Sequence, residues 1–135
     1  MKKESIEQVI RNLFAGADEH DWQKVSASLA DKVLLDYSSL NGLQASLIPS
    51  EVIVNSWKSF LPRFDRTHHQ VADFVIEIYD ERATVKFFGK AEHFLGSETW
   101  LVVGTYDTEL KDENGYWLIS KLKLNLIHQS EQILK

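Results

Sequence analysis

The chain has 135 residues, a net charge of −5, 44% hydrophobic and 26% charged residues, and no cysteine. This length and composition predict one globular domain over residues 1–135. The acidic balance argues against a nucleic-acid partner, because neutralising phosphates requires a basic face. The lack of cysteine excludes disulfides, thiolate metal sites and cysteine nucleophiles.

The first residues are polar and charged, with no apolar run behind them, and no later stretch is long enough to span a bilayer. We therefore expect no signal peptide, no membrane partner and a cytoplasmic location.

Two helices are predicted at the start of the chain. Ser5 and Gln8 form a capping-box pattern, and apolar residues then recur at helical spacing as far as Ala17. The first helix therefore buries one face. Asp21 is suited to cap a second helix, which we expect to end near residues 30–31.

A strand at about 32–37 is expected next, followed by a loop over 39–48 with mixed polarity and an Asn-Gly pair. Pro49 suits the first turn of a third helix. Pro62 should end or kink that helix, because proline lacks an amide hydrogen and restricts the residue before it.

The second half of the chain has the two-residue period of strands. Short polar turns separate four predicted strands, at about 67–79, 82–95, 98–112 and 116–127. Helices followed by an antiparallel meander predict an α+β fold, with the helices on one side of the sheet.

His93 lies on the apolar face of its predicted strand, between Ala91 and Leu95, so its ring should point into the interior or a cavity. It is either a core histidine satisfied by one hydrogen bond or a functional residue. The small residues Gly89 and Ala91 leave room on this face and favour a function.

His68 and His69 are adjacent in a strand, so their rings point to opposite sides of the sheet and cannot bind one ion together. The downstream alternation, with Phe74 and Ile76 on the apolar face, puts His68 inside unless a bulge intervenes. The pattern alone leaves both alternatives open.

Asp36 lies in the apolar strand over 32–37, where a carboxylate needs a partner to offset desolvation. A histidine partner would give an Asp–His dyad, in which the aspartate fixes the tautomer and the free ring nitrogen takes a proton. The alternative is a solvated aspartate at a strand end. A metal triad of Asp36, His69 and His93 is chemically allowed, but no ligand spacing supports it, and we expect no metal.

Tyr37, Trp57 and Tyr106 are candidates for hydrogen bonding to a ligand in a pocket, although aromatic residues at this spacing also serve as core.

Seven short motifs follow one another along nearly the whole chain: Asp21-Trp22, Val33-Leu34-Leu35-Asp36-Tyr37, Trp57, Thr67-His68-His69, Ala91-Glu92-His93, Gly104-Thr105-Tyr106 and Gly115-Tyr116-Trp117-Leu118-Ile119. Together they resemble the SnoaL-like branch of the nuclear transport factor 2-like superfamily. The resemblance implies a cystatin-like cone, in which N-terminal helices pack on a curved, mainly antiparallel sheet around an apolar pocket.

Enzymes of this branch, such as scytalone dehydratase and polyketide cyclases, use an aspartate and a histidine in the pocket without a cofactor. By resemblance, Asp36 matches the first-strand aspartate, His69 the inward histidine and His93 the second pocket histidine. Asn125 matches a late-strand asparagine that binds substrate. An inward His69 requires a bulge or twist between residues 70 and 74.

The resemblance implies a cofactor-independent lyase or isomerase, of dehydratase or cyclase type, for a hydrophobic small molecule. His69 would be the general base and Asp36 its orienting partner, and His93 with Tyr37 would polarise or protonate an oxygen. The alternative is a non-catalytic ligand-binding or assembly module, such as the small subunit of ring-hydroxylating dioxygenases. In either case we expect a homodimer formed through the outer face of the sheet.

Overall fold

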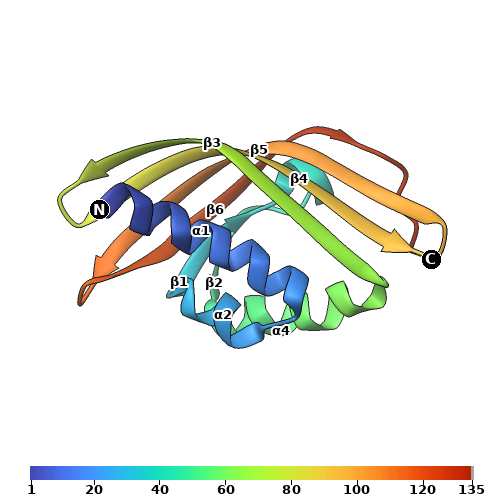
Figure 1. Ribbon diagram of the computed structural model, residues 1–135, viewed down its shortest axis with the longest axis horizontal. Coiled ribbons are helices and arrows are strands. Elements are labelled where there is room, and N and C mark those ends of the chain that lie inside the picture. The colour runs from blue at the N-terminus through green and yellow to red at the C-terminus, as the bar shows by residue number, and fades with distance from the viewer. Residues whose placement is uncertain (135) are drawn as a thin grey trace.

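The computed structural model describes residues 1–134 and has the expected α+β architecture. Figure 1 shows the long strands arching over the first helix. The helices are α1 (Lys2–Glu19), α2 (Trp22–Ala27), α3 (Ser38–Asn41), α4 (Ser50–Phe60) and the 3-10 turn η1 (Leu61–Arg63). The strands are β1 (Leu29–Asp36), β2 (Ser46–Pro49), β3 (Arg66–Tyr79), β4 (Arg82–Leu95), β5 (Glu98–Glu113) and β6 (Tyr116–Gln129).

All strands belong to one six-stranded sheet with the order β2-β1-β6-β5-β4-β3. The meander from β3 to β6 is antiparallel, as predicted, while β1 runs parallel to β6 and antiparallel to β2. The sheet is therefore curved and mainly antiparallel, and the helices lie on its concave side (Figure 1).

The helix α1 buries one face, formed by Ile6, Ile10, Leu13, Phe14 and Ala17, against this concave side. Burial of each large apolar side chain of this kind contributes roughly 1.5–3 kcal/mol. No helix in residues 1–134 combines the length and the apolar character needed to cross a membrane.

Three boundaries differ from the sequence prediction. The first helix begins at Lys2 with Met1 at its N-cap, so the Ser5 and Gln8 pattern lies inside the helix and does not cap it. The second helix ends at Ala27 rather than near 30–31, because the Ser28 carbonyl already accepts the Ile119 amide of β6 and starts the sheet. The expected loop over 39–48 contains α3 and β2, which depend on contacts distant in sequence. The Ser39 hydroxyl, for example, donates to the Leu124 carbonyl.

A bulge in β3 decides which of its residues face the core. The pairing of β3 with β4 shifts between Ala72 and Val75, and Asp73 has a positive φ of 60°. Thr67 and His69 face inward before the bulge, and Phe74 faces inward after it. The expectation of a bulge between residues 70 and 74 is confirmed, and the bulge is what allows His69 to face the concave side.

We expect Asp73→Gly to preserve or raise the free energy of unfolding, because glycine adopts a positive φ without steric cost. Asp73→Val should lower it by about 1–2 kcal/mol, since a β-branched residue is strained in this conformation. Urea denaturation measures both. Gln70→Val, at an exposed position of the same strand, is the control, and equal stability of the two valine variants would contradict the strained bulge.

Candidate active site

A cavity of about 630 Å³ lies between the concave face of the sheet and helices α1 and α4. Its wall is largely aromatic and aliphatic, which suits an apolar ligand of ring size. Five of the predicted site residues line it: Tyr37, Trp57, His69, His93 and Tyr106.

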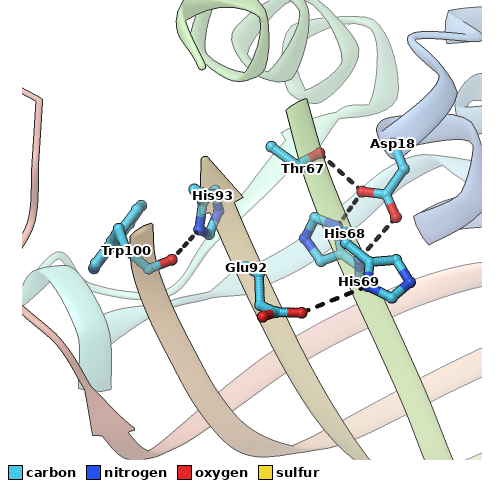
Figure 2. Close-up of polar contacts among 7 residues, drawn as sticks. All are labelled: Asp18, Thr67, His68, His69, Glu92, His93 and Trp100. Carbon is cyan, nitrogen blue, oxygen red and sulfur yellow. Dashed lines mark hydrogen bonds and ion pairs between the residues drawn. The ribbon is translucent and has the colours of Figure 1, made fainter. Parts of the chain in front are cut away.

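Of the polar residues in this wall, His69 is held from behind by a cluster that joins the end of α1 to the start of β3 (Figure 2). Asp18 Oδ1 lies 2.6 Å from His69 Nδ1 and accepts the Thr67 hydroxyl at 2.9 Å. Asp18 Oδ2 accepts the backbone amide of His69 at 2.7 Å. The carboxylate therefore holds both the main chain and the ring of the histidine.

The charge state of Asp18 fixes the tautomer of His69. Burial raises the pKa of the Asp18 carboxyl, but the hydrogen bonds and the charge of His69, with the Thr67 hydrogen bond, outweigh it, so the net pKa is lowered. An ionised carboxylate only accepts hydrogen bonds, so His69 Nδ1 carries the hydrogen. Nε2 is left with a free electron pair, as a general base requires.

The expected contact between Asp36 and a pocket histidine is wrong. Leu35 and Tyr37 line the cavity, so Asp36 between them points the other way. Its carboxylate accepts the Ser38 hydroxyl at 2.6 Å and the Ser38 amide at 3.0 Å, and these hydrogen bonds lower its pKa. The histidine partner is Asp18.

The sequence contains a signal for Asp18, in the helical pattern rather than in the strands. Asp18 follows the buried Phe14 by four residues, so it lies on the same face of α1, over the core. A carboxylate at such a position needs a polar partner.

The neighbouring His68 points to the other side of the sheet. Its side chain is 48% exposed, and its Nδ1 lies 3.5 Å from a carboxylate oxygen of Glu92. Of the two adjacent histidines, His69 is therefore the one in the cavity wall.

His93 stands across the cavity wall from His69, with the two ring centroids 6.0 Å apart. Its Nδ1 lies 3.0 Å from the Trp100 carbonyl oxygen, and its ring stacks on the Trp100 side chain at 4.4 Å. Burial lowers the pKa of His93 to about 4. The ring is thus uncharged at neutral pH, and Nδ1 carries its hydrogen because a carbonyl oxygen only accepts.

Two tyrosines supply hydroxyl groups to the cavity. The rings of Tyr37 and Tyr106 lie 6.5 Å apart. Burial raises the pKa of Tyr106 to about 12 and that of Tyr37 well above its usual range, so both hydroxyls stay protonated. Gly89 makes room for one of them, because a Cβ there would lie 2.5 Å from Cε1 of Tyr106.

The structure does not bring Asn125 into the cavity, contrary to expectation. The preceding Leu124 lines the cavity, so Asn125 faces the opposite side of β6. There its amide donates to the Asp107 carboxylate at 2.9 Å. Within residues 1–134, no cluster of three or more His, Asp or Glu side chains is arranged to hold a metal ion, and Asp36 does not join the two pocket histidines.

The cone of helices on a curved sheet, open to an apolar pocket, defines the nuclear transport factor 2-like class. Within that class, the sequence model of the SnoaL-like domain matches residues 2–123, and the chain belongs to this family. None of the curated proteins matches the sequence.

Solved structures agree with this fold. The Kfla4162 protein from Kribbella flavida is 26% identical with a TM-score of 0.90, over 95% of this chain and 92% of that one. A candidate scytalone dehydratase from Novosphingobium aromaticivorans is 14% identical with a TM-score of 0.83, over 99% and 89%. A type 2 hexachlorocyclohexane dehydrochlorinase (LinA) is 16% identical with a TM-score of 0.82, over 96% and 87%.

The buried, uncharged His93 makes stability depend on pH. Its pKa is about 4 in the folded protein and 6.5 in an ordinary histidine, so between these values the unfolded chain binds the extra proton. The stability that the neutral His93 ring contributes is therefore fully present above pH 6.5, and the free energy of unfolding falls as the pH is lowered toward 4.

We therefore expect wild-type stability to fall relative to His93→Asn by about 1 kcal/mol per pH unit in this range. Asparagine keeps a donor for the Trp100 carbonyl but does not titrate. Urea denaturation across the pH range measures the difference, with the exposed His68→Asn as control. If the free energies of unfolding of wild type and His93→Asn changed with pH in parallel, this would contradict a buried neutral ring.

Proposed function

We propose that this chain is a cofactor-independent lyase or isomerase, of dehydratase or cyclase type, for a hydrophobic cyclic small molecule. The observation that carries the proposal is the Asp18–His69 pair, whose histidine lines a largely apolar cavity of about 630 Å³. The names of two similar structures, a candidate scytalone dehydratase and a dehydrochlorinase, fit the same reaction class.

In this mechanism, His69 Nε2 takes a proton from a carbon of the ligand. The electron pair of the broken C–H bond forms a double bond, either to the carbon that loses a leaving group or within an enolate. In a dehydration, the proton on His69 passes to the departing hydroxyl, which leaves as water. The Asp18 carboxylate stabilises the imidazolium formed in between.

The developing negative charge on a ligand oxygen needs a donor. The protonated hydroxyls of Tyr37 and Tyr106 line the cavity and suit this role. His93 does not suit it, because the ring is uncharged at neutral pH and its one N–H, on Nδ1, already donates to the Trp100 carbonyl oxygen. The proton-donating role expected for His93 is therefore assigned to the tyrosines in this proposal.

The homodimer remains part of the proposal. Leu101 and Val103 of β5 are half-buried on the outer face of the sheet, beside the inward Val102. A second copy covering this face would bury them further.

We expect His69→Gln to lower turnover by about a hundredfold to ten-thousandfold, because removing a positioned general base costs this much. Asp18→Asn should also lower it, since the amide keeps the shape of the carboxylate without its charge. His68→Gln is the matched control, at an exposed position one residue away, and should retain wild-type activity.

The assay combines two measurements. Cyclic ketones and cyclic alcohols are first screened for thermal stabilisation of the protein. Proton abstraction is then followed as deuterium uptake from D₂O into the stabilising compound, and elimination as product formed. Compounds that bind without exchange or turnover would contradict the enzyme and favour a non-catalytic ligand-binding module.

A further inference from the structure

Three carboxamide side chains line the cavity from three separate segments of the chain. Asn41 ends α3, Gln129 ends β6, and Gln132 lies in the segment after β6. All three are exposed to solvent, so they lie where the cavity opens. We call these three residues the amide rim, and the mechanism proposed above uses none of them.

Two members of the amide rim use their oxygen within the fold. The Leu43 amide donates to Asn41 Oδ1 at 2.9 Å, and the Trp100 indole donates to Gln129 Oε1 at 3.2 Å. A main-chain amide and an indole can only donate, so the atom that faces each of them is the carboxamide oxygen rather than its nitrogen.

Gln132 repeats this arrangement, because its Oε1 accepts the Leu134 amide at 2.8 Å. Each of the three nitrogens carries two hydrogens, and none has an acceptor within residues 1–134. The amide rim therefore offers hydrogen-bond donors to a molecule in the cavity, while its acceptors are already engaged.

The cavity behind the amide rim has no cation to pair with an anionic ligand. Within residues 1–134, its lining includes no Lys, Arg, Asp or Glu side chain. Burial lowers the pKa of His93 to about 4, so this ring is uncharged at neutral pH, and the Asp18 carboxylate behind His69 is negative. An anionic group here would leave water without a counter-charge, whereas an uncharged carbonyl oxygen has a much smaller cost of desolvation.

We propose that the amide rim is a binding subsite for an uncharged carbonyl group of the ligand, at the end that faces the opening of the cavity. The inference narrows the substrate class to cyclic compounds that carry such a carbonyl apart from the reacting carbon. It rests on the proposed function only in that the same cavity holds the ligand.

The test reverses the hydrogen-bonding character of the amide rim. Gln129→Glu and Asn41→Asp each keep an oxygen for the internal hydrogen bond and replace the NH₂ group by a second oxygen, which only accepts. Gln70→Glu is the matched control, because it adds the same charge at an exposed position of β3 outside the cavity.

The readout is the ratio of the affinities for 2-acetylnaphthalene and 2-isopropenylnaphthalene, measured by equilibrium dialysis at neutral pH. These probes differ in a carbonyl oxygen against a CH₂ group, so the contribution of the shared ring cancels when the ratio is compared between variants. Gln129→Glu and Asn41→Asp should each lower the preference for the ketone by about threefold to tenfold, the worth of one hydrogen bond. Gln70→Glu should keep the wild-type ratio.

Two further measurements use the wild-type protein. The anion 2-naphthoate should bind about tenfold more weakly than 2-acetylnaphthalene or worse, because its charge has no cation to pair with. In ¹H–¹⁵N correlation spectra, the ketone should shift the side-chain NH₂ resonances of Asn41 and Gln129 but not those of Gln70, and 2-isopropenylnaphthalene should shift neither pair in the same way.

An unchanged affinity ratio in either rim variant would overturn the proposal. So would tighter binding of 2-naphthoate than of the ketone, NH₂ resonances that do not respond, or no binding of 2-acetylnaphthalene. A solvated rim without a role in binding predicts the first and third of these results. The readouts need no proton transfer by His69, so a failure of the proposed catalysis and a failure of the amide rim are distinguishable.

Discussion

The carboxylate of Asp18 is the interaction on which the site depends. It accepts hydrogen bonds from the Thr67 hydroxyl, the His69 amide and the His69 ring. These bonds fix the last turn of α1 against the first residues of β3. Asp18 and His69 are 51 residues apart in sequence. The tautomer of His69 follows from this contact, which also ties the end of α1 to β3.

Most of the fold could be predicted from hydrophobic spacing, because α1, β4 and β5 each bury one regular face. The elements that escaped are short and depend on distant partners. The strand β2 exists because it pairs with β1, and α3 is held by the bonds of Ser39 to β6. Neither partner is visible in the local sequence.

The site was predicted in part. Alternation along β4 placed His93 inside, and the bulge at Asp73 explains why the same rule was ambiguous for His69. Asp36 and Asn125 were expected in the cavity but face away from it, for one physical reason. Each is next in sequence to a residue that lines the cavity, and neighbouring residues of a strand point to opposite sides of the sheet. Asp18 was missed because the pairing of a helix end with a strand is a tertiary contact.

The end of α1 adds a field of its own to the site. The unsatisfied carbonyls at a helix C-terminus carry about half a negative charge, and the last turn of α1 contains Asp18 but no basic residue. The negative helix end and the Asp18 carboxylate thus lie on the same side of His69, and both favour the ring orientation that directs Nδ1–H toward α1. Without that ring, the Asp18 carboxylate would keep only the Thr67 hydroxyl and the backbone amide of residue 69 as donors. The imidazole that suits proton transfer therefore also anchors the end of the first helix to the sheet. The chain cannot lose this base without weakening the fold around it.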